Sequence, residues 1–191
     1  MPDTRFSILF VCTGNICRSA MAERLLRFRL GGVGQVGVSV SSAGTRAVVG
    51  RPMSSQTRPR LRALGGDPEG FLATQLTEYR IASADLILGM AAEHTDRVLA
   101  LEPGAFARTF LLMEFARAIS GGNDSPSADD PRRWPWLTNQ AMDARRTGLV
   151  PLRVDDDVDD PYGRGDQAFD LMARRLGPAV DALVGGQVIE R

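Results

Sequence analysis

The sequence predicts an α/β fold: a single domain with a four-stranded parallel sheet, helices on both faces and a phosphate-binding loop after the first strand. Short apolar runs alternate along the chain with longer segments of helical periodicity, which is typical of a parallel sheet covered by helices. The first apolar run, residues 8–12, ends on a cysteine and leads through a Gly-Asn loop into a helical segment. A chain of 191 residues, 43% hydrophobic, fits one domain with a substantial core.

Composition and charge argue against several classes of protein. The chain carries 23 basic and 23 acidic side chains, so we expect neither nucleic-acid binding nor attraction to a membrane surface. The apolar run near the start is too short for a membrane span, and no signal peptide is expected. Two cysteines so close together form no disulfide framework, which favours a reducing, cytoplasmic location. Neither a metal ion nor another cofactor is expected.

The first strand is followed by a predicted helix from Ser19 to Leu30. Its apolar side chains, Met21, Leu25 and Phe28, lie on one stripe, and glycines follow it, as glycine commonly does past a helix end. The chain should therefore return across the sheet after this helix.

The second strand is predicted at residues 36–40, where valines alternate with glycine and serine. A polar loop is expected at residues 41–45, at the carboxyl end of this strand. Ligands of such sheets bind at the carboxyl ends of strands, so this loop and the first one should share a site. A helix is expected from Pro52 to Leu64, stopped by two glycines.

The remaining strands and helices continue the alternation. A short helical turn is predicted at residues 79–84, a strand at 85–89 and a helix at 91–101. A fourth strand follows at 109–112 and a helix at 113–119. This pattern completes the count of four strands.

Residues of about 121–157 interrupt the alternation and are interpreted as an insertion within the single domain of residues 1–191. The segment is rich in Gly, Ser, Asp and Pro, and only residues 141–146 suggest a helical turn. Trp134 and Trp136 either anchor this insertion to the core or reach toward the pocket, and anchoring is favoured because exposed tryptophan pairs are costly.

The last helix is predicted from Asp166 to about Val184, because apolar side chains recur there at helical spacing. Gly177 and Pro178 lie inside it. Proline removes a backbone donor and clashes with the preceding turn, so a kink or break is expected.

The loop after the first strand has the chemistry of a nucleophile beneath a bound oxyanion. Backbone N–H groups and a helix N-terminus attract anions there and favour the thiolate of Cys12. The guanidinium of Arg18 suits two phosphate oxygens, and Gly14 and Asn15 tolerate the left-handed backbone such a loop needs. Attack on a phosphate monoester would give a phosphocysteine. The predicted phosphate-binding residues are Thr13, Gly14, Asn15, Ile16, Cys17, Arg18 and Ser19.

The leaving group needs a proton donor, and a carboxylic acid commonly supplies it. Three aspartates precede proline, Asp67, Asp130 and Asp160, and the residues alone leave the choice open. Ser19 is placed to hydrogen-bond the cysteine sulfur and stabilise the thiolate. His94 is interpreted as a solvated residue of a helix beside Glu93.

Four segments of the chain resemble the low-molecular-weight protein tyrosine phosphatases. They are Val11 to Ser19 with the second cysteine inside the loop, Ser42 to Thr45, Gly50 to Pro52, and Asp160 to Gly163 before the last helix. The resemblance implies that the catalytic residues are Cys12, Arg18 and Asp160, with Asp160 as general acid. Asp159 is a weaker rival, and proline after Asp160 restricts its backbone to extended forms.

The resemblance also implies supporting roles. Asn15 and Ser42 would pair to stiffen the loop, and Tyr162 is the candidate contact for the substrate ring. Cys17 would protect Cys12 through a reversible disulfide, or it merely packs. The chain departs from the family at residues 46–49, where an aromatic residue is often found.

The leading function is hydrolysis of phosphotyrosine in a protein substrate, for which a bacterial tyrosine kinase is a candidate by family analogy. A second function to consider is an arsenate reductase using the same loop, but such enzymes normally need cysteines beyond it, and none follows Cys17. A third is a non-catalytic phosphate-binding module, which would be expected to lack the nucleophile or the acid.

Overall fold

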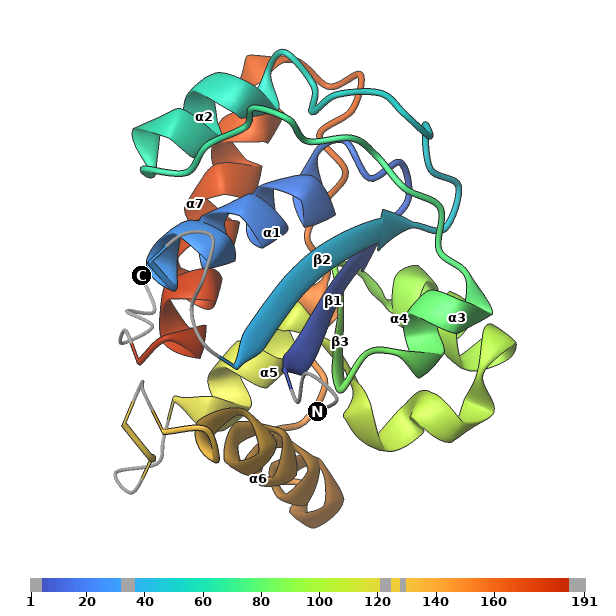
Figure 1. Ribbon diagram of the computed structural model, residues 1–191, viewed down its shortest axis with the longest axis vertical. Coiled ribbons are helices and arrows are strands. Elements are labelled where there is room, and N and C mark those ends of the chain that lie inside the picture. Colours follow the sequence, from blue (N-terminus) through green and yellow to red (C-terminus); the bar gives the residue numbers. More distant parts are fainter. Residues whose placement is uncertain (1–4, 32–36, 121–124, 128–129, 186–191) are drawn as a thin grey trace.

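The computed structural model describes residues 5–31, 37–120, 125–127 and 130–185 (Figure 1). Its elements in chain order are β1 (Phe6–Cys12), α1 (Arg18–Arg29), β2 (Val38–Gly44), α2 (Thr57–Ala63), α3 (Glu78–Ala82), β3 (Leu86–Gly89), α4 (Ala92–Leu101), η1 (Pro103–Arg108), β4 (Thr109–Leu111), α5 (Leu112–Ile119), α6 (Arg133–Thr147), η2 (Val154–Asp156) and α7 (Asp166–Leu183). Within these ranges, no helix is both long and apolar enough to cross a membrane.

The sheet has four parallel strands in the order β2-β1-β3-β4, which confirms the predicted α/β architecture. Strand β1 is central and pairs with β2 along its whole length, ending at Cys12 opposite Gly44. Its other edge pairs with β3, where Val11 lies opposite Gly89. The carboxyl ends of these strands therefore meet at one edge, and the loops that leave them lie close together.

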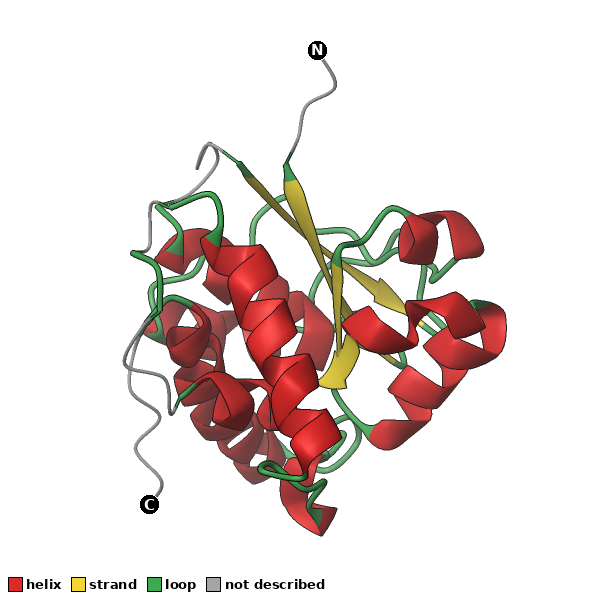
Figure 2. Cartoon of the chain, turned by 90° about the horizontal axis from the view of Figure 1, so that it is seen from below, coloured by secondary structure: helices red, strands yellow, loops and turns green. Residues whose placement is uncertain are grey.

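The residues of β1 alternate between two hydrophobic cores on opposite faces of the sheet. Ile8, Phe10 and Cys12 belong to the larger core, which α1, α2, α5, α6 and α7 complete. Leu9 and Val11 belong to the smaller core, which α3 and α4 complete. Figure 2 shows the helices divided in this way between the two sides of the strands, as the sequence predicted.

Strand β2 begins and ends later than the sequence predicted. Val36 lies outside the described residues, and the segment expected as a polar loop forms the second half of the strand, to Gly44. Two sets of hydrogen bonds explain the later end of the strand. Strand β1 pairs with it as far as Gly44, and the backbone of Gly44 also bonds Thr74 and Leu76 on its other side. Tertiary pairing overrides the low strand propensity of serine and glycine.

Helix α2 is shorter than predicted, because it begins at Thr57 and not at Pro52. A helix beginning at Pro52 would carry Pro59 in its interior, where proline breaks the hydrogen-bond ladder. In α2 the same proline lies in the first turn, where its missing N–H costs nothing. The residues before the helix bond other segments instead, and the Ser54 N–H donates to the Ile16 carbonyl at 2.9 Å.

Helix α6 is a 15-residue helix in the segment where only a turn at residues 141–146 was expected. Pro135 lies in the first turn of this helix, where proline is tolerated. Trp134 is 3% exposed and stacks on Phe6 of β1, with ring centroids 6.1 Å apart. Trp136 packs against the same core, so both tryptophans anchor the segment.

Helix α7 continues through Gly177 and Pro178, where a kink or break was expected, and no break is present. Gly177 is buried and faces Leu64 near α2, and Val180 beyond the proline is fully buried. Packing on α1 and α5 therefore holds the helix together despite the lost hydrogen bond.

Candidate active site

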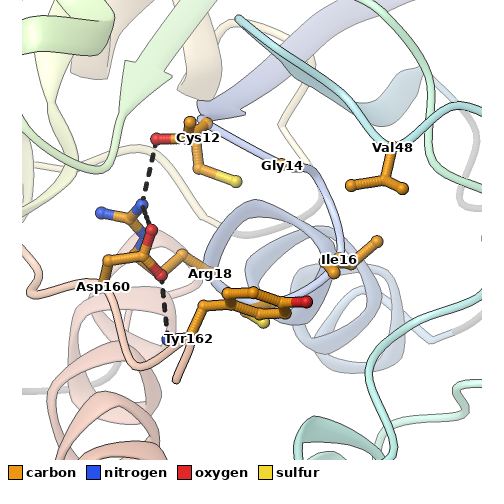
Figure 3. Close-up of a pocket in the computed structure, with 9 residues that line it drawn as sticks. Cys12, Gly14, Ile16, Arg18, Val48, Asp160 and Tyr162 are labelled. Atoms are coloured by element: carbon orange, nitrogen blue, oxygen red, sulfur yellow. Dashed lines mark hydrogen bonds and ion pairs between the residues drawn. The ribbon is translucent and has the colours of Figure 1, made fainter. Parts of the chain in front are cut away.

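A cavity of about 190 Å³ opens at the carboxyl edge of the sheet, where β1 meets the N-terminus of α1 (Figure 3). Its walls come from three distant segments of sequence. The lining residues are Cys12, Thr13, Gly14, Ile16, Cys17, Arg18, Val48, Asp160 and Tyr162. In Figure 3 the Cys12 sulfur points into the cavity between Arg18 and Asp160 on one side and Ile16 and Val48 on the other.

The Cys12 sulfur lies at the base of this cavity and accepts polar contacts from its own loop. It is 2.9 Å from the Ser19 hydroxyl oxygen, and the Asn15 backbone N–H donates to it at 3.3 Å. Both contacts, together with the N-terminus of α1, stabilise negative charge on sulfur. The arrangement suits a thiolate nucleophile.

Asn15 holds the loop in shape from its centre. Its backbone is left-handed, with φ of 56°, and it is fully buried. Its side-chain NH2 group donates to the Ser19 hydroxyl at 2.9 Å and to the Ser42 hydroxyl at 2.8 Å. Its side-chain oxygen, Oδ1, accepts a hydrogen bond from the Thr74 N–H at 2.8 Å. Asparagine tolerates this conformation better than other residues with a side chain. Of the two residues that were expected to tolerate a left-handed backbone, Asn15 adopts a positive φ and Gly14 does not.

Glu23 supports the loop from below and was not identified from the sequence. Its carboxylate accepts the Ser42 hydroxyl proton at 2.6 Å and pairs with Arg27 at 3.2 Å. Only 7% of Glu23 is exposed. A glutamate in a helix ordinarily faces solvent, so nothing in the sequence around Glu23 indicates this role.

Arg18 is buried along one wall and branches to three partners. One guanidinium nitrogen donates to the Val158 carbonyl at 3.0 Å. The other donates to Asp160 at 2.8 Å and to the Thr13 hydroxyl at 3.3 Å. These bonds fix the guanidinium plane beside the cysteine, where a planar donor fork can bind two oxygens of a tetrahedral anion.

Asp160 is the one of the four candidate aspartates that lines the cavity. Its second carboxylate oxygen accepts the Tyr162 N–H at 3.1 Å, which orients the side chain from a loop. Asp67 accepts the N–H of Glu69 and Asp130 pairs with Arg132, while Asp159 is exposed. The geometry therefore places one carboxyl group across the cavity from the sulfur.

Cys17 also lines the cavity, and it is a free cysteine, as is Cys12. Burial raises the pKa of the Cys17 thiol, outweighing hydrogen bonds from Ser54 and Thr57 that act in the opposite direction. Cys17 is therefore a thiol at neutral pH and a poorer nucleophile than a thiolate.

The mouth of the cavity is apolar. Ile16 and Val48 form one side, and the ring of Tyr162, 69% exposed, lies across the opening (Figure 3). Val48 occupies the position after the serine motif where the sequence lacks an aromatic residue. Neither tryptophan of the 121–157 segment lies among the lining residues.

His94 is buried, with 1% exposed, which corrects its interpretation as a solvated residue. Its Nε2 atom lies 2.9 Å from the Thr13 hydroxyl oxygen. Burial, aided by the charge of Arg18, lowers its pKa to about 4, so the ring is neutral at neutral pH. His94 lies in the first turn of α4, at the same edge of the sheet as Cys12.

Residues 7–132, about two thirds of the chain, match the family described as "Low molecular weight phosphotyrosine protein phosphatase". The chain belongs to this family. The fold agrees: the crystal structure of the Erwinia amylovora tyrosine phosphatase AmsI superposes with a TM-score of 0.67 at 27% identity, covering 93% of this chain and 90% of that one. The protein is accordingly a phosphatase of the low molecular weight family.

Its curated relatives in this family differ in substrate. "Low molecular weight protein-tyrosine-phosphatase Etp" of Escherichia coli K12 is 42% identical over 105 residues, which are 55% of this chain and 68% of Etp. A "Protein-arginine-phosphatase" of Geobacillus stearothermophilus is 35% identical over 121 residues, which are 63% of this chain and 78% of that protein. Family membership therefore does not distinguish phosphotyrosine from phosphoarginine as the substrate, and the residues of the site must be compared with each.

In this low molecular weight phosphatase, Gly44 at the end of β2 supports the active-site loop by its lack of a side chain. A Cβ atom there would lie 2.5 Å from the Thr13 carbonyl oxygen, so Gly44→Ala must displace the loop. We expect the free energy of unfolding to fall by about 2 kcal/mol, with kcat/KM reduced about tenfold. Urea denaturation and aryl phosphate assays measure both.

The matched control is Gly177→Ala in α7. A Cβ at that position meets Leu64 at 3.7 Å, an ordinary contact, and alanine favours the helix. We expect unchanged activity and equal or higher stability. Equal stability of Gly44→Ala and the natural protein would show that the close approach to Thr13 is not required.

Proposed function

We propose that this phosphatase hydrolyses phosphotyrosine in proteins through a phosphocysteine intermediate. The observation that carries the proposal is the division of the cavity into a charged base and an apolar mouth. Cys12 lies at the base with Arg18 on the wall beside it, while Ile16, Val48 and Tyr162 surround the opening. An aryl phosphate monoester has the same division, with a dianion at one end and a flat apolar ring at the other.

In the first step the Cys12 thiolate attacks phosphorus in line with the tyrosine oxygen. The phosphorus–sulfur bond forms as the bond to the tyrosine oxygen breaks, and Asp160 gives that oxygen its proton. Arg18 and the loop N–H groups bind the equatorial oxygens, whose charge is shared in the transition state. Without substrate, Arg18 donates a hydrogen bond to Asp160. When the phosphoryl oxygens accept the hydrogen bonds of Arg18, the Asp160 carboxyl group is released from Arg18 and can donate its proton to the leaving oxygen.

In the second step water hydrolyses the phosphocysteine. Asp160, now a carboxylate, takes a proton from the water as its oxygen attacks phosphorus. The phosphorus–sulfur bond breaks, phosphate leaves and the thiolate returns. The Ser19 hydroxyl, 2.9 Å from the sulfur, stabilises the departing thiolate. These residues supply every proton transfer and charge contact that the two steps need.

The second candidate substrate is phosphoarginine, because one relative is a protein-arginine-phosphatase. Its guanidinium is polar and carries several N–H donors, which need acceptors when they are buried. Ile16 and Val48 present no acceptor at the mouth, so burial there favours an aryl ring over a guanidinium. We therefore rank phosphotyrosine first.

Arsenate reduction and phosphate binding without catalysis have less support. An arsenate reductase relay would lack a third cysteine, since the chain has only 2. A binding module without catalysis has no need for Asp160 beside Arg18 at 2.8 Å. For the partner we propose a phosphotyrosine protein, with a bacterial tyrosine kinase as the candidate to test first, since the relative Etp is a protein-tyrosine-phosphatase.

The test compares phosphotyrosine, phosphoarginine and phosphoserine peptides with the natural protein and Tyr162→Ala. We expect the highest kcat/KM for phosphotyrosine, and a rise in its KM of about fivefold in the variant, from loss of the contact between rings. Tyr79→Ala is the matched control, because Tyr79 is also exposed to solvent but lies in α3, outside the cavity. A higher kcat/KM for phosphoarginine would overturn the proposal.

A further inference from the structure

Thr13, the residue after the nucleophile, connects the active-site loop to a buried histidine of another element. Its hydroxyl oxygen accepts a hydrogen bond from Arg18 at 3.3 Å. The same oxygen lies 2.9 Å from His94 Nε2 and 3.4 Å from Glu93 Oε1, both on α4. The hydroxyl has one proton to donate, and the histidine is the nearer acceptor.

The charges around the ring favour its neutral form. Burial and the positive charge of Arg18 lower the pKa of His94, and Asp160 and the Ala91 carbonyl only partly oppose them. The Thr13 oxygen can accept two hydrogen bonds, so its contact with Arg18 does not by itself fix the tautomer of His94. We assign the proton of the neutral ring to Nδ1, which is near the Ala91 carbonyl but makes no hydrogen bond of ordinary geometry, so that Nε2 accepts from the Thr13 hydroxyl at 2.9 Å.

We propose that His94 is a positioning residue for oxyanion binding, acting through the Thr13 hydroxyl on Arg18. By accepting a hydrogen bond from the Thr13 hydroxyl, neutral His94 turns the lone pairs of that oxygen toward the guanidinium of Arg18. This holds the guanidinium plane where it can bind two phosphoryl oxygens. The inference rests on the role proposed above for Arg18, and it adds a residue that makes no contact with the substrate.

The position of α4 makes such a connection rigid. Helix α4 follows β3 after Met90 and Ala91, and the N–H of its first residue, Ala92, donates to the Asp157 carboxylate at 2.8 Å. The next residue, Val158, accepts from the other nitrogen of Arg18 at 3.0 Å. Both terminal nitrogens of the guanidinium, Nη1 and Nη2, are therefore held by groups that also contact the first turn of α4 or follow a residue that does.

The experiment measures binding of inorganic phosphate by calorimetry, and kcat and KM for an aryl phosphate, at neutral pH. The variants are His94→Leu, which removes the acceptor, and His94→Gln, which keeps a side-chain acceptor. Thr13→Val removes the hydroxyl and keeps the shape of the side chain. The double variant Thr13→Val/His94→Leu completes a double-mutant cycle. Near-ultraviolet circular dichroism and thermal unfolding establish that each variant is folded.

We expect His94→Leu to weaken phosphate binding and raise KM about tenfold, with a smaller change in kcat. His94→Gln should restore phosphate affinity to within about threefold of the natural value, and the double variant should be no worse than either single variant. Unchanged phosphate affinity in folded His94→Leu, or additive losses in the double variant, would overturn the inference.

The same measurements separate this inference from the proposed function. If the natural protein binds phosphate and His94→Leu weakens that binding, the positioning role stands even where phosphotyrosine is not hydrolysed. If phosphotyrosine is hydrolysed and His94→Leu binds phosphate normally, the function stands and the positioning role fails. If the natural protein does not bind phosphate, both fail.

Discussion

Cys12→Ser is expected to reduce kcat/KM for an aryl phosphate by ~10⁴-fold or more. The loop is built for a thiolate: the Asn15 N–H donates to the sulfur at 3.3 Å, and the N-terminus of α1 adds partial positive charge. A serine hydroxyl stays protonated in the same field and cannot supply the nucleophile. Release of a chromogenic phenol measures the effect.

The control for this variant is its affinity for inorganic phosphate. Because Arg18 and the loop backbone are unchanged, we expect Cys12→Ser to bind phosphate within about threefold of the natural protein. More than about one hundredth of the natural activity in a folded Cys12→Ser would contradict Cys12 as nucleophile. Arsenate reduction by the natural protein with a thiol, in the absence of phosphatase activity, would point to a reductase instead.

Asp160→Asn is expected to lower kcat by ~10² to 10³-fold, because a general acid typically contributes that much. Asparagine keeps the size of the side chain and one of the two oxygens, so it can still accept from Arg18 or from the Tyr162 N–H, which bond different oxygens of Asp160. It has no acidic proton for the leaving oxygen. The loss should be greater for phenyl phosphate than for nitrophenyl phosphate, since a poorer leaving group depends more on its proton.

Asp159→Asn is the matched control, because it removes the same charge one residue earlier in the chain. The Asp159 side chain is exposed and is not among the residues that line the cavity. We expect the activity of this variant to remain within about twofold of the natural protein. A greater loss in Asp159→Asn than in Asp160→Asn would transfer the role of general acid to Asp159.

Strands β3 and β4 were predicted well, because buried parallel strands appear directly as apolar runs. The segments expected at residues 85–89 and 109–112 correspond to β3 and β4 within one residue at each end. Helices with proline in the first turn were predicted poorly. Pro59 lies in the first turn of α2, which was predicted to begin at Pro52. Pro135 lies in the first turn of α6, of which only residues 141–146 were predicted, as a turn.

The sequence gives weaker indications of structure where the position of a residue depends on tertiary contacts. His94 is a polar residue beside a glutamate, and only the packing of α4 on the loop shows that it is buried. The strand formed by residues 41–44 depends on neighbours from two other segments. Such contacts join residues far apart in the chain, so local propensity and periodicity do not report them.

Local patterns in the sequence were enough to predict the fold class and to propose the chemistry of the loop, because both depend on short segments of the chain. Cys12, Arg18 and Ser19 lie within eight consecutive residues, between a buried strand and a helix. The tertiary structure decided which distant residues join them. The residues alone left three Asp-Pro aspartates open and resemblance favoured Asp160, which the fold places 2.8 Å from Arg18. The physical reason is that parallel strands end at one edge of the sheet, where loops from remote segments meet.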